Sequence, residues 1–225
     1  SCLRAARENA HAVRGTLTAE MWESVNATWI EQRQQNFENI LARGISEFFD
    51  WVKLRSAVTR GVTFGTMLKD DALHFIRLGG LLERGDNTAR ILDMQYHILR
   101  QNDDEGASDF YRWGALLRSL SAFQVYRKVY RDAITPARVA ELLVLNMDLP
   151  RSLHSCADGI VRMLQLIANS ASAETARQAG VLHARLHFAR IDDVLGGGLH
   201  EYLTDFMDRV FELGDGISRD FLMPE

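Results

Sequence analysis

The sequence predicts an all-α fold, a bundle of about seven to eight long, mostly antiparallel helices. Three observations support this prediction. Apolar residues recur at the spacing of a helix face along most of the chain, whereas no segment alternates apolar and polar residues as a strand does. Prolines stand only at positions 136, 150 and 224, so few points interrupt a long helix. With 225 residues, the chain is long enough to bury a sizeable core as one domain.

Caps and breakers define four helices in the first part of the chain. Thr18 is a capping residue for the second helix. Gly61 and Gly65 indicate a turn after the third. Asp70 or Asp71 can cap the fourth, the longest of the chain. The expected helices cover residues 2–14, 19–35, about 37–59 and about 71–100.

The second part is divided in the same way. Ser108 and Ser172 are expected caps, and Thr135 followed by Pro136 supplies a cap and a proline at the first helical position. The glycine run 196–198 stops a helix. The expected helices cover residues 108–132, 136–146, 150–168, 172–194 and 199–221.

The segment 72–100 is expected to be central and covered on two sides, because it has two apolar stripes. Glu83, Asn87 and Arg90 lie within or beside the second stripe. These polar groups are therefore expected to have partners inside the fold or at the floor of a cleft. The first stripe holds Leu78, Leu81, Leu82, Ala89, Leu92, Tyr96 and Leu99, and the second Leu73, Ile76, Ile91, Met94 and Ile98.

Two interpretations of this charged face remain open. Arg127 falls in the apolar stripe of the expected helix 108–132, and a buried guanidinium needs an acid, for which Glu83 is the first candidate. A closed ion-pair network that fixes helix packing is one interpretation. The other is a pocket in which an arginine binds a carboxylate or phosphate while Glu83 orients an amine or acts as a base. After Arg127, the next candidate partners of Glu83 are Arg118 and Arg151. The candidate arginines for the pocket are Arg84, Arg90, Arg118, Arg127 and Arg151.

Three segments resemble a known family. They are Leu82–Arg90, with its Glu-Arg pair, Trp113–Arg127 and Asn146–Leu153. On these segments, and over nearly its whole length, the chain resembles the alpha-E domain proteins of bacteria. The resemblance implies a single all-helical domain over 1–225. It also implies genomic company with circularly permuted ATP-grasp proteins and transglutaminase-like peptidases, and hence a part in peptide ligation or modification.

Members of that family typically carry an earlier Glu-Arg motif near the N-terminus, which this chain lacks. The helical pattern is already present at Leu3. We therefore expect that a natural N-terminal segment is missing, and that an exposed apolar groove lies near residues 2–14.

The leading functional interpretation is an accessory or substrate-presenting protein acting with an ATP-grasp peptide ligase. The alternative is an enzyme in its own right, a transferase or hydrolase acting on a small peptide, with Glu83 and Arg84 catalytic. A third interpretation is a structural protein that forms homo-oligomers. In the enzyme, the substrate-binding residues would be Asn87, Arg90, Arg118, Arg127 and Arg151.

Composition argues against other classes. The net charge of −4 is unlike that of a general nucleic-acid binder. No stretch is long and apolar enough to span a membrane, and no secretory signal is visible. The two cysteines, Cys2 and Cys156, have no metal-type spacing and suggest a reduced, cytoplasmic chain. The 23 arginines suit carboxylate or phosphate binding, although a GC-rich genome would also produce them.

The spacings of possible metal ligands give only weak evidence for a metal site. Glu8 with His11 and Asp71 with His74 echo the paired motifs of di-iron bundles, but the bridging glutamates cannot be assigned. His183 and His187 are four residues apart without the glutamate of a zinc peptidase motif, and are expected to be solvated or capped. We predict neither a metal nor a cofactor.

Overall fold

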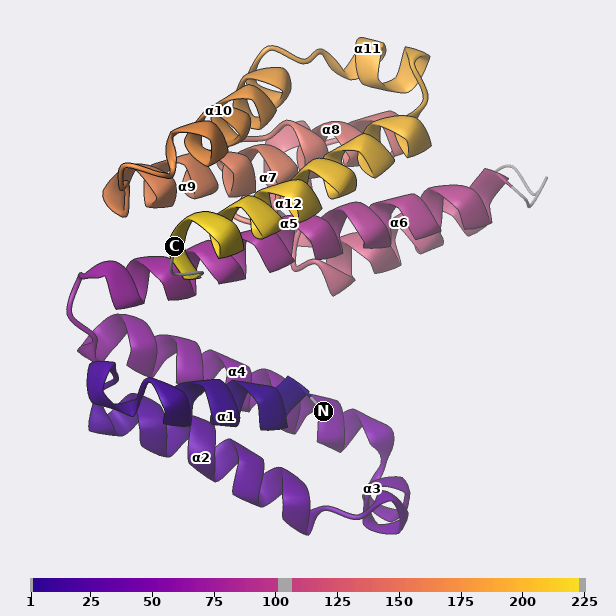
Figure 1. The fold of residues 1–225 in the computed structure, drawn as a ribbon. Coiled ribbons are helices and arrows are strands. Elements are labelled where there is room, and N and C mark those ends of the chain that lie inside the picture. Colours follow the sequence, from indigo (N-terminus) through magenta and orange to yellow (C-terminus); the bar gives the residue numbers. More distant parts are fainter. Residues whose placement is uncertain (1, 101–106, 223–225) are drawn as a thin grey trace. The chain divides into compact units, whose positions relative to one another are not determined.

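The computed structural model describes residues 2–100 and 107–222, and every regular element in these ranges is a helix. The predicted all-α class is confirmed (Figure 1). None of the described helices combines the length and the apolar character needed to cross a membrane. The elements are α1 (Cys2–Ala12), the 3₁₀ turn η1 (Arg14–Thr16), α2 (Ala19–Gln34), α3 (Phe37–Arg43), α4 (Ile45–Thr66), α5 (Asp71–Arg100), α6 (Ala107–Ser119), α7 (Phe123–Tyr130), α8 (Pro136–Val144), α9 (Leu153–Leu166), α10 (Ala173–His187), α11 (Ile191–Gly196) and α12 (Leu199–Leu222).

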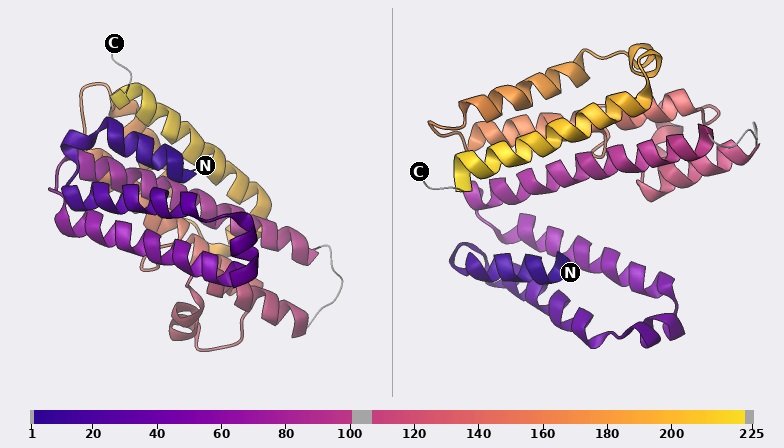
Figure 2. Two further views of the ribbon diagram at one scale, coloured as in Figure 1. Left: turned by 90° about the horizontal axis from the view of Figure 1, so that it is seen from below. Right: turned by 45° about the vertical axis from the view of Figure 1, so that its right-hand side comes forward.

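The chain divides into two compact units, Ser1–Phe75 and Ile76–Glu225, with the boundary inside α5. In the first unit, α2 packs against α1 and α4 (Figure 2). The expected cap is present, because the hydroxyl of Thr18 accepts a hydrogen bond from the backbone N–H of Met21. This cap provides an acceptor for one of the backbone donors left unpaired at the start of α2.

The predicted helix 37–59 is wrong at both its middle and its end. Gly44, with φ of 104°, separates α3 from α4, and a side chain would rarely tolerate that conformation. The expected turn at Gly61 and Gly65 is absent, because α4 continues through both glycines to Thr66. A glycine inside a helix costs only about 1 kcal/mol relative to alanine, which the packing of α4 on α2 can offset.

The groove expected near residues 2–14 has a mixed rather than apolar lining. A pocket of about 490 Å³ lies there, with two arginines and one tryptophan in its wall. Its lining residues are Arg7, Asn26, Trp29, Ile30, Arg33 and Gln34. Large exposed apolar side chains of this unit gather instead on α3 and α4, and include Phe37, Leu41, Ile45, Phe49, Leu54 and Phe64.

In the second unit, α5 runs beside α12 (Figures 1 and 2). The first apolar stripe of α5 is buried at Leu78, Ala89 and Leu92, as expected. The second stripe is not covered as expected, since Met94 and Ile98 are 57% and 41% exposed. Ile76 and Ile91 of the same stripe are half-buried, so within this unit the second face is covered only in part.

The predicted helix 108–132 is broken into α6 and α7. Ser121 adopts a left-handed conformation, with φ of 56°, and the backbone N–H of Ala122 donates to the carbonyl of Leu117 (2.7 Å). This turn resets the rotation of α7 about its axis relative to α6. Consequently Tyr126 is buried and Arg127 is exposed, although the pattern of one continuous helix placed Arg127 among apolar residues.

Two further boundaries differ from the prediction. The helix expected over 150–168 begins at Leu153, because Ser152 is its cap and accepts from the backbone N–H of Ser155. The helix expected over 172–194 ends at His187, and extended backbone at Arg190 starts α11. The predicted glycine stop is present, with Gly198 at φ of 97° between α11 and α12.

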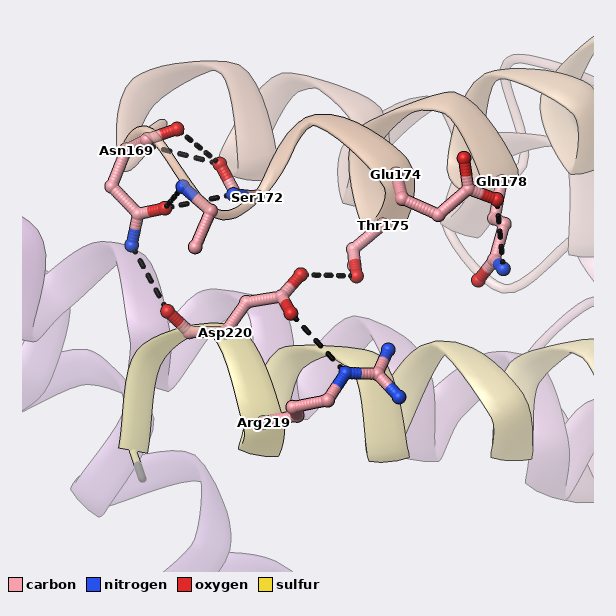
Figure 3. A network of polar contacts seen from close by, with 8 residues as sticks. Asn169, Ser172, Glu174, Thr175, Gln178, Arg219 and Asp220 are labelled. Atoms are coloured by element: carbon pink, nitrogen blue, oxygen red, sulfur yellow. Dashed lines mark hydrogen bonds and ion pairs between the residues drawn. The ribbon is translucent and has the colours of Figure 1, made fainter. Parts of the chain in front are cut away.

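Polar contacts between the start of α10 and the end of α12 are shown in Figure 3. Thr175 of α10 donates its hydroxyl to the carboxylate of Asp220 on α12 (2.5 Å). The amide of Asn169 donates to the backbone carbonyl of Asp220 (3.1 Å). A Cβ placed on Gly216 of α12 would lie 2.6 Å from the Thr175 hydroxyl oxygen. Only glycine therefore fits at this point without a shift of the two helices.

Candidate functional site

The Glu-Arg motif of α5 is divided between two surfaces. Glu83 is exposed, and it takes part in no hydrogen bond or ion pair among residues 2–100 and 107–222. Arg84 is half-buried and donates from Nη1 to the backbone carbonyl of Pro150 (3.3 Å). One residue of the motif is thus presented to solvent, and the next is held by the fold.

The turn that Arg84 contacts is built by the segment Asn146–Leu153. The side-chain oxygen of Asn146 accepts from the backbone N–H groups of Asp148 and Leu149, an arrangement that suits asparagine in turns. The hydroxyl of buried Ser152 donates back to the Asn146 carbonyl. Two of the three segments that carry the family resemblance, Leu82–Arg90 and Asn146–Leu153, therefore meet at Arg84 and Pro150.

Close packing accompanies this contact. A Cβ on Gly85 would lie 3.3 Å from the ring of Phe206 on α12 and 3.5 Å from the Cβ of Cys156 on α9, so glycine allows α5 to approach both helices. Burial raises the pKa of the Cys156 thiol to about 11, and the charges of Arg84 and Arg151 oppose that rise. A thiol with so high a pKa is a packing residue rather than a nucleophile.

The remaining predicted site residues each have contacts of their own. Arg90 pairs with Asp86 on its own helix (2.7 Å), and this contact raises the pKa of Arg90. The guanidinium of Arg118 lies 4.2 Å from the ring centroid of Phe123. Arg151 is half-buried, and its charge acts on Cys156 together with that of Arg84.

The expected buried pair of Glu83 with Arg127 is wrong. Both side chains are exposed, and no ion pair or hydrogen bond of the described residues joins Glu83 to Arg127, Arg118 or Arg151. The turn at Ser121 removes Arg127 from the apolar stripe, so it no longer needs a buried acid. Asn87 is exposed beside Glu83 and Arg90 on α5. We name these three residues, Glu83, Asn87 and Arg90, the outer face of α5.

The sequence reading missed a histidine cluster between α9 and α10. His154 of α9 lies with His183 and His187 of α10, and their ring centroids are 5.3, 5.5 and 5.7 Å apart. The pair His183 and His187 was expected to be solvated or capped, but His183 is half-buried against His154. The sequence spacing could have predicted this cluster. His183 and His187 lie about as far after the α9–α10 connection as His154 lies before it. Helices that fold back on each other bring such positions together.

A second group contains Asp93 and His97 of α5 and His200 of α12. The Nδ1–H of His200 lies between Asp93 Oδ1 (2.8 Å) and Nε2 of His97 (3.0 Å). The hydrogen bond to Asp93 raises the pKa of His200. Here the polar atoms satisfy one another, so the group resembles an ion pair between helices more than a vacant binding site.

Comparison with known proteins identifies the family. Residues 1–222 match the family model Alpha-E, described as a predicted alpha-helical domain with a conserved ER motif. The chain therefore belongs to this family, and the ER motif corresponds to the Glu-Arg pair expected from the resemblance. No curated protein and no solved structure matches the chain.

Proposed function

We propose that this chain is an accessory, non-catalytic protein that works with a circularly permuted ATP-grasp ligase and presents the peptide on which the ligase acts. The observation that supports this proposal is the outer face of α5. Glu83 is exposed there without a partner among the described residues, while the adjacent Arg84 is held by the Pro150 carbonyl. A carboxylate on a rigid helix is suited to bind a partner's donors.

The chemistry of the outer face of α5 complements that of a peptide. Seven residues separate Glu83 from Arg90, which corresponds to about 10 Å along a helix, the length of roughly three residues of extended peptide. Glu83 can accept hydrogen bonds from an amine or backbone N–H. Arg90 uses Nε for Asp86, so its remaining N–H groups can donate to a carboxylate or carbonyl. Asn87 between them offers both a donor and an acceptor.

The proposed partners follow from the family resemblance. They are the ATP-grasp ligase and a transglutaminase-like peptidase, with the bacterial cytoplasm as the proposed location because ligation consumes ATP. The described surface offers the outer face of α5 for such contacts, and its charges suit a peptide better than a nucleic acid.

Co-purification with the ATP-grasp protein encoded beside this chain tests the proposal. We expect Glu83→Gln to weaken the complex or the yield of peptide product, measured by mass spectrometry, without lowering the melting temperature. Glu23→Gln is a matched control, because Glu23 is also an exposed glutamate within a helix. A Glu83→Gln variant that binds and supports product formation like the wild type would contradict the proposal.

The alternative enzyme, with Glu83 and Arg84 in its site, predicts turnover by the chain alone. Arg84→Met removes the Pro150 contact and should lower stability by about 1 kcal/mol, so a loss of activity in that variant alone does not assign a catalytic role. Peptide transfer or hydrolysis by the purified chain without the ligase, abolished by Glu83→Gln, would favour the enzyme.

A further inference from the structure

The histidine cluster between α9 and α10 has the geometry of a metal site. The four-residue spacing of His183 and His187 places both rings on one face of α10, and that face packs on α9 at His154. One ring nitrogen from each of the three histidines can be chosen so that all three lie within 4.8 Å of one another. The three rings therefore surround a common point.

The tautomer of His154 leaves a lone pair on its buried Nε2. His154 is only 6% exposed, and its Nδ1 lies 2.9 Å from the carbonyl of Leu145. A carbonyl only accepts, so Nδ1 carries the proton, and Nε2 of the neutral ring is bare. Nε2 is buried and has no hydrogen-bond partner among the described residues. Metal-bound histidines commonly donate their other N–H to a backbone carbonyl in this way.

His183 presents a second buried ring nitrogen. Its Nε2 is buried without a hydrogen-bond partner among the described residues, and the nearest carboxylate oxygen, Oδ1 of Asp158, is 3.9 Å away. Burial and the neighbouring His154 lower the pKa of His183, although Asp158 opposes them. Two unpartnered buried nitrogens would be an unfavourable arrangement if nothing bound there.

We propose that His154, His183 and His187 bind one divalent transition-metal ion of the Zn²⁺ class. Three histidines with an open fourth position form a known zinc arrangement, and the exposed side of His187 leaves that position to water or a ligand. Zinc–nitrogen bonds of about 2.1 Å place tetrahedral ligand atoms roughly 3.4 Å apart, so small side-chain rotations would close the site. This proposal is independent of the outer face of α5.

Asp158 supplies the charge beside the ion. It lies one helical turn after His154, and its Oδ2 is held by Arg162 (2.7 Å). Its Oδ1 faces His183 and can accept from a metal-bound water. The group of Asp93, His97 and His200 is less suited to bind a metal ion. Its nitrogen and oxygen atoms already contact one another, because the Nδ1–H of His200 lies between Asp93 Oδ1 and His97 Nε2.

Zinc titration of the chelator-treated full chain tests the site. We expect one Zn²⁺ per chain with a Kd near or below about 1 μM in calorimetry, and visible absorption bands of tetrahedral Co²⁺ when cobalt is used. Zinc at about a hundred times Kd should raise the melting temperature by roughly 5–10 °C. The shift should be absent after the metal is removed.

Two variants separate this cluster from other histidines. His187→Gln changes an exposed side chain and should weaken zinc binding at least 10-fold while the metal-free protein keeps its melting temperature. His97→Gln removes an exposed histidine of the other group and should leave zinc binding unchanged. Failure to bind Zn²⁺ or Co²⁺ below about 100 μM, or equal loss in both variants, would overturn the proposal.

Discussion

Helix α10 has two contacts of opposite character within the second unit. Towards α12, Thr175 and Asp220 pair their polar atoms, and Gly216 allows the backbones to approach closely (Figure 3). Towards α9, the rings of His154 and His183 meet, and two of their buried nitrogens have no hydrogen-bond partner in the described part of the chain. We call these the α10–α12 contact and the α10–α9 contact.

The difference indicates which contact serves the fold and which is available for a ligand. Buried polar groups in folded proteins are nearly always hydrogen-bonded, and the α10–α12 contact follows that rule. The α10–α9 contact departs from it at a place where three histidines converge. Departures of this kind cluster at functional sites. Substitutions in the α10–α12 contact are therefore expected to lower stability, whereas substitutions in the α10–α9 contact are expected to weaken ligand binding and to leave stability unchanged or higher.

The largest expected effect is that of Thr175→Val in the α10–α12 contact. The substitution keeps the shape of the side chain but removes the hydroxyl that donates to Asp220, whose side chain is only 9% exposed. Hydrogen bonds to charged groups contribute about 1.5–3 kcal/mol, and we expect a loss of about 2 kcal/mol in the free energy of unfolding. Urea denaturation of wild type and variant measures it, and an unchanged midpoint would show that this contact is not stabilising.

Gly216→Ala should have the next largest effect. The added methyl would lie 2.6 Å from the Thr175 hydroxyl, and overpacking costs about 1–3 kcal/mol, partly offset by up to about 1 kcal/mol of helix propensity. We expect a net loss of about 1–2 kcal/mol in chemical denaturation. Gly214→Ala is the matched control in α12, because no atom lies within 4 Å of its Cβ position. It should be neutral or stabilising, and equal effects of the two variants would contradict the close approach.

In the α10–α9 contact we expect the reverse. His183→Leu removes a buried nitrogen that has no hydrogen-bond partner among the described residues, so the metal-free protein should keep its stability or gain up to about 1 kcal/mol. Urea denaturation in the presence of a chelator measures this effect. A loss as large as that of Thr175→Val would show that both contacts serve the fold alike.

The smallest effect concerns the contact of α12 with α5. The hydrogen bond to Asp93 raises the pKa of His200 above 6.5, and a raised pKa means that the protonated ring stabilises the fold. The contribution is fully present below about pH 6.5 and is lost as pH rises through the raised pKa. Asp93 and His97 of α5 and Glu201 of α12 are the ionisable groups around it.

The stability difference between wild type and His200→Gln should therefore shrink from about pH 5.5 to about pH 8.5. Urea denaturation across this range measures the difference, and Asp93→Asn should show the same trend. A difference that is constant with pH would mean that the charge on His200 does not contribute.

Local signals predicted many features of the fold. The capping hydroxyl of Thr18 predicted the start of α2 correctly. The same reasoning failed at residues 119–123, where a helix ends, and at Gly61, where a helix continues. No single residue type at these positions predicts whether the helix is interrupted. Whether a polar turn interrupts a helix depends on packing energies that sequence spacing does not contain. An error in a helix boundary therefore also misplaced side chains around the helix axis. Arg127, for example, was expected in an apolar stripe and is exposed.

The sequence by itself determined the helical class and the family, because periodicity and motifs are local properties of the chain. Only the tertiary structure decided that Arg84 is held by Pro150 while Glu83 is exposed, and that His154 joins His183 and His187. These relations depend on how α5, α9 and α10 rotate and pack. Such rotations follow from the sum of many weak contacts distributed over the chain.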